Sequence, residues 1–197
     1  MELRTVRLTD DIVLRPATTA DAGALARAYD HSRDHLGPWE PVRPPEFFTA
    51  AGQLAGLQVY EQERAEGLRA RWLLWDESAP GAGEGGGPVV AGGITLSNIA
   101  GGPFRSANLG YWMHVAYAGR GIATSAVTAV CAAADADLGL HRLEAGTLLH
   151  NAASQRVLAK CGFKEFGLAP SYLHINGAWR DHRLFQRLLN DRAPAAN

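Results

Sequence analysis

The chain has 197 residues, 47% of them apolar and 20% charged, and its 19 Lys and Arg against 20 Asp and Glu give a formal net charge of -1. This length suits one domain with a sizeable core, and the balanced charge excludes a protein-wide basic field that would attract nucleic acid. No apolar run reaches the length of a membrane span and residues 1–7 lack the apolar core of a signal peptide, so a cytoplasmic location is expected.

The first half of the chain alternates strands with helices. Ile12, Val13 and Leu14 predict a short strand, and Thr18 and Thr19 are suited to cap a helix that runs to about residue 35. The other elements predicted in this half are a helix over 47–66 and a strand over 71–75.

A proline-rich loop separates the two predicted helices. Prolines recur between residues 38 and 45, and each one fixes φ and removes an amide hydrogen. No regular structure is expected there, so Trp39 and Glu40 lie on a stiffened loop.

A glycine-rich segment over about 77–88 follows the strand at 71–75. A mobile hairpin loop is favoured over a ligand-binding glycine loop, because no helix follows the segment. Two further strands are predicted, over 89–96 and 108–115.

The segment after the strand at 108–115 has the form of a pyrophosphate cradle. Gly119, Arg120 and Gly121 form a turn between that strand and an alanine-rich helix over 122–138. The first amides of a helix have no partner within it and share its positive dipole end, which suits a diphosphate. Glycine also permits positive φ and close approach of a ligand. By itself, this pattern fits an ordinary connection between a strand and a helix at least as well.

The second half is predicted to fold as a strand over 142–149, a helix over 151–161 ending on Gly162, and two closing strands over about 163–175 and 178–188. Such an order of elements predicts a single α+β (α/β layered) domain over 1–197, with a mixed sheet and packed helices. A short disordered tail is expected from about 191 to 197.

The two cysteines, Cys131 and Cys161, lie in predicted helices and far apart in sequence. They are interpreted as buried reduced thiols, in preference to a disulfide or a metal site.

Several short segments occur together in this chain. They are Gly121 with Ala123, 151–154 (Asn-Ala-Ala-Ser), Gly162-Phe163, 175–182 (Ile-Asn-Gly-Ala-Trp-Arg-Asp-His), 36–43 (Leu-Gly-Pro-Trp-Glu-Pro-Val-Arg) and Ser97-Asn98. In this combination the chain resembles the GCN5-related N-acetyltransferase (GNAT) superfamily, and within it the RimJ/RimL group of ribosomal-protein N-terminal acetyltransferases. The resemblance covers nearly the whole chain.

The resemblance implies the GNAT fold, with a mostly antiparallel central sheet of about seven strands and helices on both faces. It implies acetyl-CoA as cosubstrate and no metal. The family signature has Gln or Arg, two residues, Gly, one residue, then Gly or Ala. Ala118 stands at the first of these positions, and the cradle is expected to survive because the usual residue acts largely through its main-chain amide.

The implied acetyl-CoA contacts fall into two groups. The pantetheine arm would pair with the main chain of Met113, His114 and Val115, although core packing alone also accounts for Met113 and Val115. The phosphate groups would lie against Gly119, Arg120, Gly121, Ala123 and Thr124.

The start of the 151–161 helix supplies two further candidates. Asn151 is at least as well explained as a helix cap as by contact with acetyl-CoA. The resemblance implies that the Ser154 hydroxyl donates to the sulfur of coenzyme A and so assists departure of the thiolate. Local hydrogen bonding in the first turn is the alternative role for Ser154.

On the acceptor side, Glu40 is the candidate general base, and Trp39 and Tyr111 join it as candidate acceptor-binding residues. A solvated loop carboxylate is the alternative for Glu40. The other candidate bases are His114, His174, Asp181 and Tyr111. A peptide α-amine has a pKa near ~7.7–8.0 against ~10.4 for lysine, so an N-terminal acceptor needs only a weak base.

The resemblance therefore implies an N-acetyltransferase that moves acetyl from acetyl-CoA to a primary amine by direct attack in a ternary complex. A protein N-terminal α-amine is the favoured acceptor. The alternatives are a small-molecule amine acetyltransferase, for example in detoxification or antibiotic modification, and a non-catalytic acyl-CoA sensor or interaction domain. A monomer or homodimer without nucleic-acid or membrane partners is expected.

Overall fold

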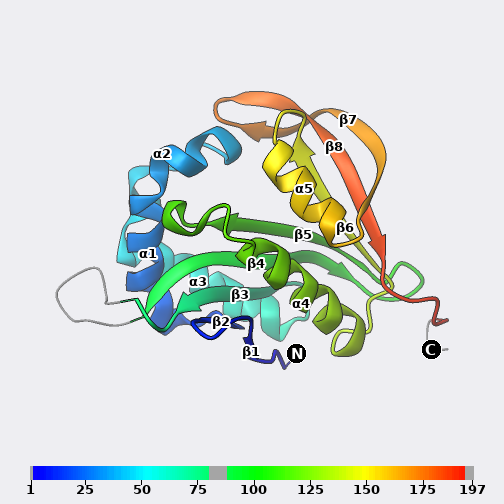
Figure 1. Cartoon of the computed structure of the whole chain (residues 1–197), viewed down its shortest axis with the longest axis horizontal. Coiled ribbons are helices and arrows are strands. Elements are labelled where there is room, and N and C mark those ends of the chain that lie inside the picture. Colours follow the sequence, from blue (N-terminus) through cyan, green and yellow to red (C-terminus); the bar gives the residue numbers. More distant parts are fainter. Residues whose placement is uncertain (1, 80–87, 194–197) are drawn as a thin grey trace.

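The computed structural model describes residues 2–79 and 88–193 (Figure 1). The core of the glycine-rich loop expected over 77–88 and the end of the tail expected over 191–197 lie outside the described residues. No helix within the described ranges is long and apolar enough to cross a membrane.

One eight-stranded sheet forms the centre of the molecule, with strand order β1-β2-β3-β4-β5-β6-β8-β7. Neighbouring strands are antiparallel except β5 and β6, which are parallel. The sheet has one strand more than the sequence predicted, because the two-residue β1 pairs with β2. The strands are β1 (Val6–Arg7), β2 (Ile12–Pro16), β3 (Ala70–Asp76), β4 (Val89–Ala100), β5 (Ser106–Met113), β6 (Arg142–Leu148), β7 (Lys164–Ile175) and β8 (Ala178–Leu188).

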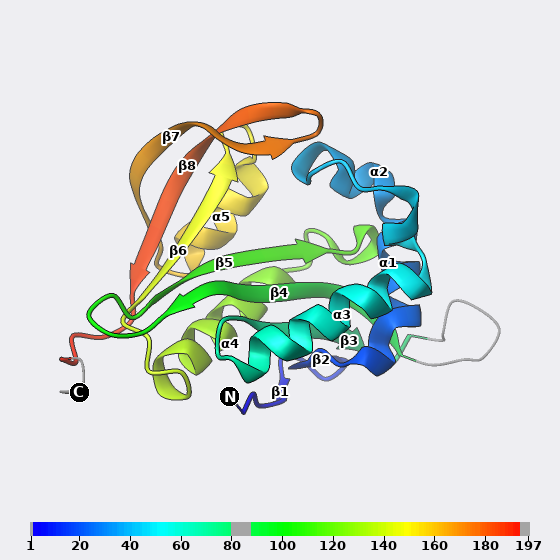
Figure 2. The same cartoon turned by 180° about the vertical axis from the view of Figure 1, so that it is seen from behind.

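Helices cover both faces of the sheet, as the two opposite views show (Figures 1 and 2). α1 (Ala22–His31) and α3 (Ala50–Ala65) lie on one face, and α4 (Ile122–Ala136) and α5 (Ala152–Lys160) on the other. Side chains of β3 alternate between the two layers: Leu73 packs with α1 and α3, and Trp72 with α4 and α5. The mixed sheet with helices on both faces confirms the predicted fold class.

The structure divides the helix predicted up to residue 35. α1 and the short α2 (Arg33–Leu36) meet at Ser32, whose φ of -107° and ψ of 10° are not helical. Ser32 is fully buried, and its Oγ accepts a hydrogen bond from the amide of Val115 at 3.2 Å. The prediction of one continuous helix was wrong because a contact with a segment 83 residues away fixes this break.

Short turns replace the irregular loop that the prolines predicted. Two 3-10 turns, η2 (Gly37–Trp39) and η3 (Pro45–Phe48), each have a proline in one of their first two positions. α3 then begins at Ala50 and not at 47, because Thr49 caps it by accepting a hydrogen bond from the Gly52 amide at 3.1 Å. The remaining turns are η1 (Thr19–Asp21) and η4 (Val115–Tyr117).

β5 and β6 pair over only three positions, from Ser106 with Arg142 to Asn108 with Glu144. Beyond these residues the two strands separate, and β6 continues its pairing with β8 on its other side. Figure 2 shows the wedge that results. The fold thus leaves one edge of β5 uncovered in the middle of the sheet.

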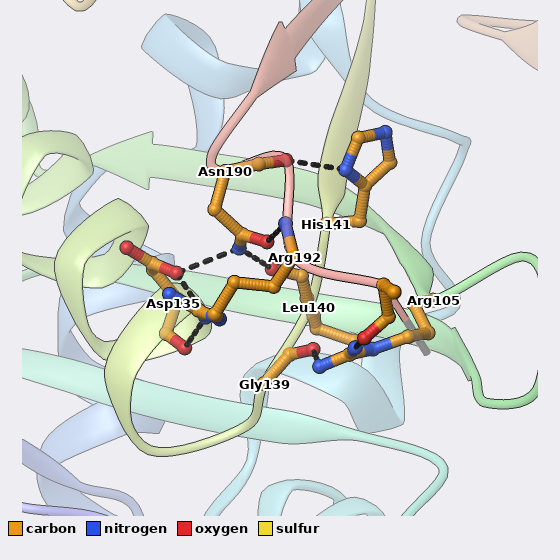
Figure 3. Close-up of polar contacts among 8 residues, drawn as sticks. Arg105, Asp135, Gly139, Leu140, His141, Asn190 and Arg192 are labelled. Carbon is orange, nitrogen blue, oxygen red and sulfur yellow. Dashed lines mark hydrogen bonds and ion pairs between the residues drawn. The ribbon is translucent and has the colours of Figure 1, made fainter. Parts of the chain in front are cut away.

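A polar network holds the closed end of this wedge (Figure 3). The carbonyl of Arg105, just before β5, accepts from the amides of His141 and Arg142 at 2.8 and 3.2 Å. Asn190, after β8, donates through Nδ2 to Asp135 at 2.7 Å and to the Leu140 carbonyl at 2.8 Å. The segments before β5, before β6 and after β8 are therefore tied together where the strands meet.

We expect Asn190→Ala to lower the free energy of unfolding by about 1–3 kcal/mol, because it leaves the Leu140 carbonyl without this donor. Arg7→Ala is the control: its ion pair with Glu77 is 2.7 Å long but about half exposed on both sides, so its removal should cost less than about 1 kcal/mol. Urea denaturation of both variants provides the measurement. Equal stability of Asn190→Ala and the wild type would contradict a stabilising role for the network.

Candidate active site

A cavity of about 390 Å³ occupies the wedge between β5 and β6. On one side it is lined by Gly119, Ala123 and Ser154, at the starts of α4 and α5. On the other side it is lined by Trp39 and Glu40 from the loop after α2. Its lining also includes Met113, which packs with the α4 and α5 core, and Trp112, which packs with the α1 and α3 core, so the cavity reaches both faces of the sheet.

The open edge of β5 can pair with an extended ligand. The His114 amide donates to the Ala91 carbonyl of β4 at 3.0 Å. Backbone groups alternate in direction along an antiparallel strand, so those of Tyr111 and Met113 point away from β4 and toward the wedge. An extended chain could add to the sheet there as a further short strand.

The three residues predicted to pair with such a chain differ in this respect. Met113 presents its backbone to the wedge, whereas the amides of His114 and Val115 already donate to Ala91 and Ser32. The His114 ring caps η4, because its Nδ1 accepts from the Ala116 amide at 3.1 Å. Burial, with His31 and His35 nearby, lowers the pKa of His114, so the ring is held neutral in this capping role.

The turn before α4 has the backbone form predicted for a phosphate cradle. Gly119 and Gly121 have φ of 76° and 80°, the left-handed region that favours glycine. Gly121 is the N-cap of α4, and the first bond within the helix is donated by Thr124 to the Gly121 carbonyl at 3.0 Å. The amides of Ile122 and Ala123 precede that bond, so they are left to bind an anion. Arg120 is exposed, with its guanidinium 5.1 Å from the centre of the Tyr117 ring.

Tyr117 anchors this turn to the sheet, a contact that the sequence did not reveal. Its hydroxyl donates to Oδ2 of Asp76 at 3.0 Å. Burial opposes ionisation of Asp76, but hydrogen bonds from Ser78, Tyr117 and Ala79 lower its pKa. Burial and the adjacent Asp76 raise the pKa of Tyr117 to about 12, so the phenol remains a donor. The one sequence feature that could have indicated this anchor is an aromatic residue two positions before the glycine turn.

The first turn of α5 holds Asn151 and Ser154 as a unit. Oδ1 of Asn151 accepts from the Ser154 amide at 3.0 Å, so Asn151 caps the helix. The Ser154 hydroxyl lies 2.8 Å from the hydroxyl of Tyr111 on β5. Burial raises the pKa of Tyr111 to about 12, which keeps this phenol protonated. Tyr111, predicted as an acceptor-binding residue, lines the cavity and also contacts Ser154.

The loop that carries Trp39 and Glu40 bridges the far walls of the cavity. The Trp39 ring lies 5.3 Å from that of His150, just before α5. The Glu40 carbonyl accepts from the amide of Asn176, in the turn between β7 and β8, at 3.0 Å. Burial raises the pKa of the Glu40 carboxyl, an effect opposed by Arg43, whose Nε is 3.5 Å away.

Two buried polar residues in the cavity wall were missed from the sequence. Thr147 is 4% exposed, and within the described residues its hydroxyl has no hydrogen-bond partner. His182 is 3% exposed, and its Nδ1 lies 3.0 Å from the Arg180 carbonyl. The sequence pointed instead to its neighbour Asp181, whose carboxylate accepts from the Ser171 amide in an exposed position. His174, another candidate base, packs against Trp179 and does not line the cavity.

Residues 2–79 and 88–193 contain no group of three or more His, Cys, Asp or Glu placed to hold a metal ion. Cys131 and Cys161 are free and buried, as predicted.

Comparisons with known proteins agree with this geometry. Residues 11–164 match the family model described as acetyltransferase (GNAT) domain. The chain is 34% identical over 190 residues to ribosomal protein uS5-alanine N-acetyltransferase of Escherichia coli (strain K12), covering 96% of this chain and 94% of the relative. Ribosomal-protein-S5-alanine acetyltransferase from Vibrio fischeri superimposes with a TM-score of 0.88 and 31% identity, over 97% of this chain and 100% of that one. Mycobacterium smegmatis RimJ in complex with CoA-disulfide superimposes with a TM-score of 0.81 and 30% identity, over 90% of this chain and 81% of that one.

We expect Gly121→Val to weaken coenzyme A binding about tenfold or more. A β-branched residue at φ of 80° is strained, and its side chain would stand where the ligand approaches the first amides of α4. Calorimetry measures the affinity, and a thermal melt confirms folding. Gly56→Ala, in the interior of α3 with open space around the added carbon, is the control and should bind normally. Unchanged affinity in folded Gly121→Val would contradict the cradle.

Proposed function

This chain belongs to the GNAT family of acetyltransferases, and from that premise we propose that it acetylates the α-amine at the N-terminus of a protein. The observation that carries the proposal is the cavity lined from both faces of the sheet. Acetyl-CoA reaches it from the side of α4 and α5, and the acceptor from the side of α2. The two substrates meet in the wedge, so transfer proceeds by direct attack within a ternary complex.

Acetyl-CoA is held at three places. Its pyrophosphate lies on the glycine turn, against Gly119, Arg120, Gly121, Ala123 and Thr124. Its pantetheine arm extends along the open edge of β5 beside Met113. His114 and Val115 act indirectly, because their amides donate to Ala91 and Ser32 and so fix the end of β5. Asn151 acts indirectly, because its cap fixes the first turn of α5 and with it the position of Ser154.

Ser154 assists departure of the thiolate by donating its hydroxyl hydrogen to sulfur. The Tyr111 hydroxyl lies 2.8 Å from the Ser154 hydroxyl and 3.2 Å from the Ser154 carbonyl, and when its single hydrogen is donated to the hydroxyl oxygen, the serine hydrogen is left for the substrate. Charge on sulfur grows as the thioester breaks, so the bond from Ser154 is strongest at that moment.

The acceptor lies under the loop of Trp39 and Glu40. The Glu40 carboxylate attracts the positively charged N-terminus, and Trp39 with His150 bounds the opening. A peptide α-amine is already partly neutral near pH 7, whereas a lysine amine is almost wholly charged. The named activity of the Escherichia coli relative, acetylation of the alanine of ribosomal protein uS5, supports an N-terminal acceptor.

The acceptor assignment predicts that N-terminal peptides are acetylated about a hundredfold or more faster at neutral pH than a lysine peptide with a blocked N-terminus, because of the difference in amine pKa. Competing peptides analysed by mass spectrometry measure this ratio, and thiol release measures turnover. Dominant lysine acetylation would overturn the assignment. Preference for small amines would favour a small-molecule enzyme, and coenzyme A binding without turnover of any acceptor would favour a sensor.

We expect Ser154→Ala to lower kcat about a hundredfold while the affinity for acetyl-CoA stays near that of the wild type, because the lost bond acts mainly as the thioester breaks. Stability should change little, since the bond from the residue 154 amide to Asn151 is retained. Steady-state kinetics and a thermal melt are the measurements. A loss of stability with unchanged kcat would assign Ser154 a purely structural role.

A further inference from the structure

His182 occupies a defined place in the wall of the cavity. It lies on β8 between Leu148 of β6 and Ala169 of β7. A side chain added at Gly146 of β6 would lie 3.6 Å from the His182 ring and 3.6 Å from the Tyr172 ring. The two rings therefore lie on the face of the sheet that a side chain at position 146 would occupy.

That face is the one from which the acceptor arrives. Ala145, next to Gly146 on β6, and its partner Phe185 on β8 pack into the core with α4 and α5. Because side chains alternate along a strand, Gly146 and His182 belong to the opposite face, on the side of α2. His182 and Ser154 thus line one cavity from opposite sides.

The hydrogen bonding of His182 fixes its chemistry. A carbonyl oxygen can only accept, so Nδ1 donates to the Arg180 carbonyl at 3.0 Å. In the neutral ring, Nε2 then carries the lone pair and is the one ring nitrogen left to act on a molecule in the cavity. The Tyr172 ring, 5.5 Å away in an edge-on arrangement, holds the imidazole in place.

We propose that His182 is the general base of this acetyl transfer, an inference that rests on the proposed function. Nε2 accepts the proton that the acceptor nitrogen loses after it attacks the thioester carbonyl. Glu40, the base candidate from sequence, lies on the loop at the opening of the same cavity with Arg43 3.5 Å away, and burial raises the pKa of its carboxyl against the effect of Arg43, so the experiment must separate these two residues.

The step balances. A bond forms between the amine nitrogen and the carbonyl carbon, and the bond from that carbon to sulfur breaks. The amine attacks in its neutral form, after the ammonium has given one proton to solvent; nitrogen then loses a second proton to His182, and sulfur gains one through Ser154. Solvent then takes the proton from His182 and restores that of Ser154.

Other titratable groups surround His182, and several of them are paired with one another. On β8 itself, Asp181 accepts from the Ser171 amide and Arg183 pairs with Glu165 of β7 at 3.0 Å. The titratable residues of β6, Arg142 and Glu144, lie at its far end and pair with each other. The groups that share the cavity or touch the ring are Glu40, His35, Tyr111 and Tyr172.

The test compares His182→Asn with His174→Asn. An asparagine amide can replace Nδ1 as donor to the Arg180 carbonyl but offers nothing in place of Nε2. His174 is the matched control, a histidine on the adjacent strand β7 that does not line the cavity. Wild-type acetylation of an N-terminal peptide first establishes the proposed function independently of this comparison.

We expect His182→Asn to lower kcat about a hundredfold with unchanged melting temperature and coenzyme A affinity. The base must be unprotonated, so wild-type kcat rises with pH through the pKa of the base in the ternary complex. This rise should be absent in His182→Asn and retained in Glu40→Gln and His174→Asn. Added imidazole should restore part of the kcat of His182→Ala. A wild-type pH profile in His182→Asn, or loss of the rise in Glu40→Gln alone, would overturn the proposal.

Discussion

The wedge that forms the cavity depends on how β6 divides its backbone hydrogen bonds between β5 and β8. This strand can pair with β5 on one side and β8 on the other, and it pairs with β8 along its whole length but with β5 over only three residues. Beyond Asn108 the backbone of β5 is therefore turned toward a gap in the middle of a sheet. Unpaired backbone groups in such a place are costly when buried, and an extended ligand is the partner that the fold leaves them.

The gap persists only if β5 and β6 are held apart beyond the three residues at which they pair. The network of Arg105, Asp135 and Asn190 ties three segments together at the narrow end, so the strands meet at a fixed point. At the wide end, the bonds of Tyr117 to Asp76 and of Val115 to Ser32 fix the segment that precedes the glycine turn before α4. These contacts hold both ends of the wedge in place without filling the cavity between β5 and β6.

Local patterns predicted most of this architecture. Alternation and turn residues placed the two closing strands at nearly their observed bounds, and Gly162, with φ of 78°, ends α5 as expected. The glycine turn and the Asn151 cap are also local features, so the sequence revealed them. The break at Ser32, the anchor of Tyr117 and the place of His182 each depend on a partner far along the chain. No periodicity encodes such contacts, so the sequence indicates Asp181 as a candidate base and does not indicate His182.

The loop over residues 37–40 has a consequence for how an acceptor gets in. The Trp39 ring contacts that of His150, and the Glu40 carbonyl accepts a hydrogen bond from the Asn176 amide, so the loop spans the opening and is attached on both sides of it. A free chain end can pass beneath such a loop, whereas the middle of a polypeptide can enter only if the loop is lifted away from one of its two contacts. One hydrogen bond and one ring contact cost only a few kcal/mol to break, so lifting is feasible but adds a step. Under the proposed function, such a span would favour chain ends over internal segments, independently of the basicity of the amine that they carry.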